Sequence, residues 1–142
     1  MKLNNKGFTL VEVLAVVAIL AILSGVAISA VTKYQEKARQ EAYEAMHSTA
    51  YAAAQNYIQA RSSVIPTASD TPSYKEIKIE TLLDEGFMKD FKDPAQDSTD
   101  CAKQGSYVRI TKQEGSGSKL SSYTYVVHIE CSQYSDTKTF NS

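Results

Sequence analysis

The stretch Lys6-Gly7-Phe8-Thr9-Leu10-Val11-Glu12 opens an apolar run that continues to Val31, and Glu12 is the only ionisable residue from Phe8 to Val31. The run is 24 residues long. As a helix it spans about 36 Å, more than a hydrocarbon core of about 30 Å. An acidic side chain costs about 2.5–3.5 kcal/mol at mid-bilayer and less toward an edge. We therefore expect Glu12 to have a positively charged partner.

These residues resemble the N-terminal signal of type IV prepilins, in which a short basic leader ends in glycine and Phe-Thr-Leu-Val-Glu follows at once. The resemblance implies that prepilin peptidase cuts after Gly7 and methylates the new amino group of Phe8. It also implies that Glu12 serves filament assembly. That amino group lies four residues from Glu12 in its own chain. In a packed filament, one subunit's glutamate can also meet another subunit's amine.

The resemblance is specific from about Lys6 to Val31, and beyond that segment it rests on layout more than on residues. It departs at Ser29, where many type IV pilins have proline, a residue that breaks helices. Ser24-Gly25 is then the remaining weak point in the expected helix.

Two other interpretations of the apolar segment stay open. Small residues around Ser29 suit a secretory signal peptide cut after that residue. The run is, however, longer than the usual apolar core of about 7–15 residues, and such a core does not need a glutamate. A plain single-pass membrane anchor also fits the length of the run.

Size and charge restrict the classes of function. The 142 residues allow one small domain attached to a hydrophobic segment. Without the leader, which carries Lys2 and Lys6, thirteen basic and sixteen acidic residues leave a side-chain charge of −3. This balance offers no electrostatic case for a nucleic-acid site. The leader lysines favour a cytoplasmic N-terminus, so the bulk of the protein is expected outside the membrane.

Helical character continues beyond the apolar run. Residues 32–61 contain no proline or glycine and are rich in alanine, which favours helix. A continuous helix over 8–61 would be about 80 Å long, too long for one compact domain of this size. Lipid, and later other subunits, must then cover half of it. We expect a sheet to pack on one largely apolar stripe with spacings of three and four: Tyr34, Ala38, Ala42, Ala45, Thr49, Ala53, Asn56 and Ala60.

Residues 62–105 are expected to connect this helix to a sheet. Pro66 and Pro72 indicate a loop over 62–73, and residues 75–79 suit a short extended piece. A helical turn over 80–86 is expected to end at Gly86. Phe87, Met88 and Phe91 supply apolar anchors, and Asp93-Pro94 turns the chain.

The final third is expected to be β. Alternation predicts strands over 106–111 and 121–131 and an edge strand over 134–140. Residues 115–118, Gly-Ser-Gly-Ser, would connect the first two. The side chains on one face of the second strand are apolar or aromatic: Tyr123, Tyr125, Val127 and Ile129.

Cys101 and Cys131 suit an oxidising location outside the cytoplasm. A disulfide between them would close a loop of about 30 residues, worth about 3.5–4 kcal/mol in the chain-entropy model. Two free buried thiols are the alternative.

The expected fold class is α+β, with a long N-terminal helix packed on a small antiparallel sheet. This order resembles the pilin fold, especially the short-headed type IV pilins of Gram-positive bacteria. The expected parts are a removed leader (1–7), a hydrophobic transmembrane and assembly half of the helix (8–31), an amphipathic half (32–61) and a globular β-rich head (62–142).

No catalytic, metal or cofactor site is expected. His47 and His128 lie far apart, the cysteines form no Cys-x-x-Cys pair, and both histidines suit solvated or hydrogen-bonded structural roles. No nucleophile elbow or phosphate-binding glycine pattern is present. A cluster of acids lacks the ligand spacing of a calcium loop and is expected to be a solvated face: Asp84, Glu85, Asp90, Asp93, Asp97 and Asp100.

The sequence thus predicts a structural subunit of a type IV pilus, stored in the cytoplasmic membrane with its head outside and then polymerised into a cell-surface filament. The implied partners are other copies of the chain through the N-terminal helix, prepilin peptidase and the pilus assembly machinery. Type IV pili support twitching motility, adhesion, biofilm formation or DNA uptake, and the resemblance does not select among these activities. The alternatives are a minor pilin or pseudopilin of a type II secretion or competence system, and a membrane-anchored binding domain that never polymerises.

Overall fold

The structure is a computed structural model that describes residues 8–67, 73–113 and 122–141. The leader with Gly7, the loop residue Pro72 and the expected connection at 115–118 lie outside these residues. The chain forms two compact units, Met1–Ala38 and Arg39–Ser142.

One helix, α1 (Leu10–Ala60), provides the described helical residues of the first unit and continues into the second. The helix expected over 8–61 is confirmed, with ends that differ by one or two residues. Its backbone stays helical through Ser24-Gly25 and Ser29. The Ser24 hydroxyl donates to the Leu20 carbonyl (2.7 Å) within the same helix. This hydroxyl therefore has a hydrogen-bond partner inside the apolar segment itself.

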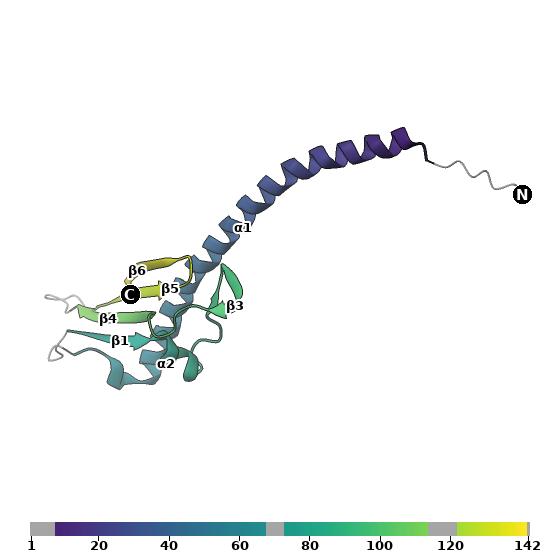
Figure 1. Cartoon of the computed structure of the whole chain (residues 1–142). Helices are drawn as coiled ribbons and strands as arrows, with labels where there is room; N and C mark the ends of the chain where they lie inside the picture. Colours follow the sequence, from purple (N-terminus) through teal and green to yellow (C-terminus); the bar gives the residue numbers. More distant parts are fainter. Residues whose placement is uncertain (1–7, 68–72, 114–121, 142) are drawn as a thin grey trace, which may run out of the picture. The chain divides into compact units, whose positions relative to one another are not determined.

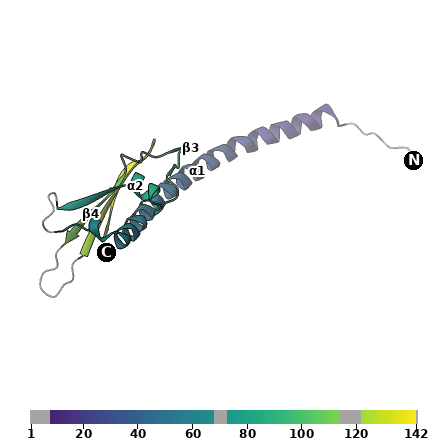
Figure 2. The ribbon, with the colours of Figure 1, turned by 90° about the horizontal axis from the view of Figure 1, so that it is seen from below.

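The second unit packs the C-terminal part of α1 on a four-stranded antiparallel sheet, in two layers (Figures 1 and 2). The strand order is β1 (Tyr74–Lys78), β4 (Tyr107–Gln113), β5 (Ser122–Glu130) and β6 (Ser135–Asn141). The α+β fold class, the short strand near 75–79 and the three C-terminal strands are confirmed.

Alternation along the strands builds the core. Val108 and Ile110 on β4, and Val127 and Ile129 on β5, have no exposed surface. Ile77 on β1 and Tyr125 on β5 are also buried, with 4% and 5% of their surface exposed. Because successive side chains of a strand point to opposite faces, this pattern places one apolar face of the sheet against the helix.

The face of α1 that meets the sheet differs from the expected stripe. Of that stripe only Ala53 is buried, whereas Ala42, Ala45 and Thr49 are exposed. The buried face carries larger side chains together with small ones: Tyr43, His47, Ala50, Ala53, Ala54, Tyr57 and Ile58. The expectation was wrong because burying tyrosine and isoleucine removes more apolar area from water than burying alanine.

The chain between α1 and β4 forms several short elements. A 3-10 turn, η1 (Ser62–Val64), follows α1, and α2 (Ile79–Asp84) follows β1. Gly86 then has φ +76°, a left-handed conformation that glycine adopts without strain. Glycine therefore ends this helical turn, as expected.

A second, two-stranded sheet lies beyond this turn and was not expected. In it β2 (Lys92–Asp93) pairs with β3 (Gln96–Asp100). The ammonium of Lys92 lies 2.8 Å from the Asp100 carboxylate across the pair. Strands this short and polar carry no alternating pattern, so the sequence indicated only the turn at Asp93-Pro94.

Candidate functional site

The first residues of α1 form a reciprocal capping arrangement. Thr9 precedes the helix, and its amide nitrogen and hydroxyl both donate to Oε2 of Glu12 at 2.9 Å. The Glu12 amide nitrogen lies 3.3 Å from the Thr9 hydroxyl oxygen, which accepts its proton. This is a capping box, in which residues Thr-x-x-Glu satisfy amide groups that the first turn of a helix leaves unpaired.

This arrangement gives Glu12 a partner that the sequence analysis missed. The Thr9-Leu10-Val11-Glu12 spacing is a known capping signal, and it predicts this partner as directly as the charge of Glu12 predicts an amine. In the uncut chain the Phe8 nitrogen belongs to a peptide bond, and Glu12 is bonded to Thr9. The pairing of Glu12 with a Phe8 amine stays a prediction for the cut chain.

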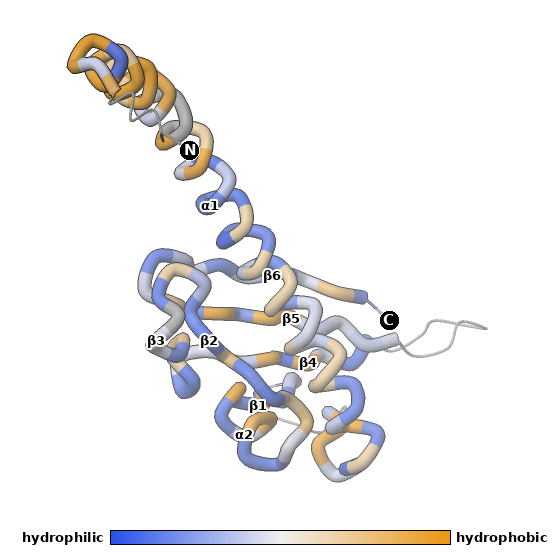
Figure 3. Tube along the Cα trace, turned by 90° about the vertical axis from the view of Figure 1, so that its right-hand side faces the viewer, coloured by the Kyte–Doolittle hydropathy of each residue, from blue (hydrophilic) through white to orange (hydrophobic). Residues whose placement is uncertain are grey.

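The helix that follows this cap exposes its apolar side chains. Figure 3 shows the N-terminal part of α1 as hydrophobic almost throughout and later turns as mixed. Phe8 is 88% exposed, and Val31, at the far end of the segment, is 51% exposed. Among the described residues there is one helix, α1, that is long enough and apolar enough to cross a membrane. A surface of this kind needs lipid or other protein to cover it.

In the second unit, Cys101 and Cys131 form the expected disulfide, with a Cα–Cα distance of 4.3 Å. Backbone hydrogen bonds surround it. Cys101 N donates to Phe91 O (3.0 Å), Ala102 N to Glu130 O (2.8 Å), and Cys131 N to Tyr134 O (2.7 Å). The disulfide thus joins the end of the β2–β3 sheet to the end of β5.

Removing this bond is expected to destabilise the head. A Cys101→Ala, Cys131→Ala double variant should lose about 2–5 kcal/mol of unfolding free energy, because its unfolded chain is no longer constrained. Denaturant unfolding of the purified protein measures this loss. Reducing the wild-type protein should lower its stability to the same level, and reductant should leave the double variant unchanged. A loss below about 1 kcal/mol would contradict the prediction.

Asp93 adds a second link at this corner and departs from the expected solvated acidic face, whereas the other acids of that set whose burial is described are exposed as expected: Asp84, Glu85, Asp90 and Asp100. Its side chain is 1% exposed. One carboxylate oxygen accepts from Ala95 N (2.8 Å), and the other accepts from Ser132 N (2.9 Å). Burial alone would raise the pKa of Asp93, but these hydrogen bonds outweigh it and hold the pKa below its ordinary value. The carboxylate therefore ties the β2–β3 turn to the segment after β5.

The lowered pKa of Asp93 sets the direction of a pH effect. Its stabilisation is complete above the unfolded-state pKa of about 3.9 and is lost as pH falls through the lower folded-state value. An Asp93→Asn variant should lose about 1–3 kcal/mol near neutral pH, since one buried amide loses its acceptor. The difference in unfolding free energy between this variant and the wild type should become smaller below about pH 4.

Urea unfolding from pH 7 to pH 2 tests this prediction, with Asp90→Asn as the control. Asp90 is exposed and lies three residues away, so its variant should follow the wild-type curve. Lys103 and Lys92 hold the pKa of Asp100 at about 2, and this group titrates alike in all three proteins. If Asp93→Asn loses the same unfolding free energy at every pH, the ionised carboxylate of Asp93 is not the source of the stabilisation.

The histidines have structural surroundings. His47 is fully buried; its Nδ1 lies 3.2 Å from Tyr43 O and its Nε2 3.4 Å from Asp136 O. His128 Nδ1 lies 2.9 Å from the Thr137 hydroxyl. Within the described ranges, no group of three or more His, Cys, Asp or Glu side chains is placed to hold a metal ion.

Comparison with known proteins bears on the N-terminal segment. Residues 2–28 match the prokaryotic N-terminal methylation motif, which is the type IV prepilin signal. No curated protein and no solved structure matches the chain. The motif marks substrates of prepilin peptidase and pilin-type structural proteins, which are not enzymes. With the apolar helix that follows it, the motif fits a membrane-anchored precursor and then a surface pilus, and it supports a type IV pilin-like or pseudopilin protein.

Proposed function

We propose that this chain is a structural subunit of a type IV pilus that is stored in the membrane and then polymerised into an extracellular filament. The observation that carries the proposal is the methylation motif over residues 2–28, which continues into a helix with exposed apolar side chains. In this proposal residues 1–7 are the removed leader and 8–31 the membrane and assembly segment. Residues 32–61 connect that segment to the head, residues 62–142.

Burial keeps the assembled filament stable outside lipid. In the membrane, the segment from Phe8 to Val31 contacts hydrocarbon, and in a filament it contacts other copies of itself. Covering more than about 1,000 Å² of apolar surface per subunit, at about 25 cal/mol/Å², gives on the order of 25 kcal/mol before entropy costs. This term has no preferred direction, so it does not set the axial step between subunits.

Glu12 supplies the specificity in this proposal. After cleavage the Phe8 amine is largely protonated at neutral pH, with a reference pKa of about 7.7–8.0. A buried charge left without its partner costs about 3–5 kcal/mol. Subunits in the wrong register would therefore be disfavoured. The cap uses Oε2 of Glu12, and a carboxylate has a second oxygen with which to accept from an amine.

Expression in a piliated host, with and without active prepilin peptidase, tests the proposal. With the peptidase, the chain should appear in thin filaments sheared from the cells, and without it the chain should stay in the membrane fraction. Abundant long filaments would indicate a major subunit. Traces within filaments of another subunit, or short filaments, would indicate a minor pilin or pseudopilin. A processed chain that never leaves the membrane would contradict polymerisation.

A further inference from the structure

A polar hollow of about 330 Å³ lies on the head, between α1 and the chain that leads from β5 into β6. Its volume is near the lower end of the range of about 300–1,000 Å³ that small-molecule sites occupy. Most of the side chains that line it carry hydrogen-bonding groups: Gln40, Glu44, Gln133, Ser135, Asp136 and Lys138. No role in the core or in the apolar segment accounts for this gathering.

The register of the sheet explains why the hollow is polar. Asp136 on β6 pairs with Ile129 on β5, a fully buried residue. Lys138 pairs in the same way with the fully buried Val127. Because paired residues of neighbouring strands point to the same face, both charged side chains point to the side of the sheet that faces α1. Inward-pointing charges also protect an edge strand from pairing with another chain, but that role requires no polar groups on the facing helix.

The hollow offers hydrogen-bonding groups that the protein itself does not use. Within the part of the chain that the structure describes, the side-chain amides of Gln40 and Gln133 have no hydrogen-bond partner. The Lys138 ammonium lies 3.5 Å from one oxygen of Glu44. One oxygen of Asp136 accepts from the next amide of its own strand at 2.7 Å. Each carboxylate therefore keeps a second oxygen as an acceptor.

Two tyrosines hold the walls of the hollow in place. The Tyr43 hydroxyl donates to Ile129 O (2.7 Å), and the Tyr134 ring stacks on the Tyr43 ring with centroids 5.0 Å apart. Cys131 N, next to the disulfide sulfur of the same residue, donates to Tyr134 O (2.7 Å). A site whose walls are already ordered loses less conformational freedom when a ligand binds.

The chemistry of the lining selects a neutral ligand that is rich in hydroxyl groups. Two carboxylates and one ammonium give the lining a charge of −1, which disfavours an anion. Amides and carboxylates together supply donors and acceptors, and each hydroxyl of a sugar both donates and accepts. The half-buried Tyr134 ring adds apolar surface, which suits the C–H face of a sugar ring.

We propose that this hollow binds a sugar, as a free monosaccharide or as the terminal residue of a glycan. The carboxylates of Glu44 and Asp136 accept from its hydroxyls, the amides of Gln40 and Gln133 donate to them, and Tyr134 packs against its ring. The site lies within the head and uses no residue of the apolar segment. It therefore goes beyond the proposed function and does not depend on polymerisation.

Saturation-transfer difference NMR tests this site on the full chain, held in a detergent without sugar head groups. The probes are D-glucose, D-galactose, D-mannose and N-acetyl-D-glucosamine, each as the free sugar and as its methyl glycoside. At least one probe should receive saturation from the protein. A methyl glycoside that binds as well as its free sugar identifies the end of a glycan as the ligand, because the methyl group stands where a glycan continues. Loss of binding on methylation identifies the free sugar. No saturation of any probe would overturn the inference.

A Gln40→Ala, Gln133→Ala double variant places the binding in this hollow. Both side chains are exposed, so the head should fold as the wild type does, which thermal unfolding checks. The dissociation constant for the sugar should rise at least about tenfold, because two hydrogen bonds are lost. Unchanged affinity would overturn the inference.

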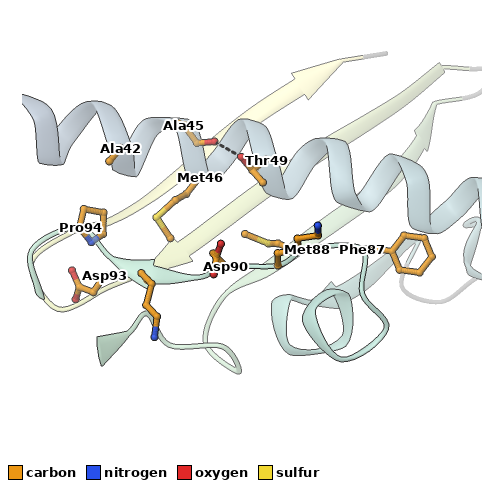
Figure 4. Close-up of a pocket in the computed structure, with 11 residues that line it drawn as sticks. Ala42, Ala45, Met46, Thr49, Phe87, Met88, Asp90, Asp93 and Pro94 are labelled. Carbon is orange, nitrogen blue, oxygen red and sulfur yellow. Dashed lines mark hydrogen bonds between the residues drawn. The ribbon is translucent and has the colours of Figure 1, made fainter. Parts of the chain in front are cut away.

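The matched control removes two exposed residues from a different hollow beside α1. That hollow is the larger groove that Figure 4 shows between α1 and the segment 87–94, and Lys89 and Asp90 line it. A Lys89→Ala, Asp90→Ala double variant should bind the sugar as the wild type does. An equal loss of affinity in this control would overturn the assignment to the polar hollow.

Filament formation separates this inference from the proposed function. Filaments made of a chain that binds none of the probes would overturn the sugar site and leave the pilus subunit standing. A processed chain that binds a sugar in the hollow but never polymerises would support the sugar site and overturn the proposed function.

Discussion

A Gly7→Arg precursor is expected to stay almost entirely uncut. The motif match includes Gly7, and its resemblance to the prepilin signal implies that the residue before the cut must be small to fit the peptidase site. Misplacing a scissile bond by about 1 Å costs roughly 100-fold in rate. Uncut precursor should therefore accumulate on a gel and show the intact mass of the full chain.

Asn5→Arg is the control for this variant. It adds the same side chain to the leader two residues upstream and leaves Gly7 in place. We expect it to be cut as the wild type is. If Gly7→Arg reaches the wild-type ratio of cut to uncut chain, the assignment of Gly7-Phe8 as the cleavage site is wrong.

A Glu12→Ala variant is expected to enter the membrane normally and to lose most filament incorporation. The variant's apolar segment lacks the charge of Glu12, so its insertion into the membrane costs less free energy than that of the wild type. In the filament, the Phe8 amine of a neighbouring copy would be buried without its counter-ion. A penalty of about 3–5 kcal/mol corresponds to a loss of roughly 100-fold or more in the assembly equilibrium.

The capping box makes the choice of control decisive. Glutamine is accepted in place of glutamate at the third helical position of a capping box. Glu12→Gln therefore keeps the hydrogen bonds to Thr9 and removes the charge. We expect it to fail as Glu12→Ala does, whereas Thr9→Ala, which keeps the charge, should retain more filaments.

Counting filaments per cell and the processed chain in the membrane fraction gives the readout for these variants. Normal piliation by Glu12→Ala would refute the role of the glutamate. Normal piliation by Glu12→Gln, with a defect in Glu12→Ala, would assign the effect to the helix cap instead of the charge.

Much of the fold follows from local pattern. The span of α1 was predictable because Phe8 to Arg61 lacks proline and contains only one glycine, Gly25. The main strands were predictable because β5 alternates over nine residues, with Tyr125, Val127 and Ile129 buried on one side. Gly86 was predictable as a stop because its left-handed backbone conformation favours glycine.

The rotation of α1 was not predictable from spacing alone. In an alanine-rich helix, the stripe through Ala42, Ala45 and Thr49 and the face through Tyr43 and His47 recur at the same intervals. Which one turns inward depends on the area that each buries against the sheet and on partners for the polar groups. Tyr43 OH donates to Ile129 O (2.7 Å), and His47 lies between two carbonyl oxygens, contacts that exist only once the sheet has formed.

The burial of Asp93 was likewise not predictable from the local sequence. A carboxylate in an acidic, turn-forming stretch is usually solvated. This one is buried because the chain after β5 brings the Ser132 amide to it from a position 39 residues away. Long-range hydrogen bonds of this kind leave no mark in local composition.

The N-terminal mass of the chain recovered from sheared surface fibres tests the central claim most directly. The account predicts a chain that begins at Phe8 and carries one methyl group on its amine. A chain in the fibres, or on the cell surface, that still begins at Met1 would indicate a plain anchor, and one that begins at Ala30 would indicate a secreted domain. Either result would contradict the account.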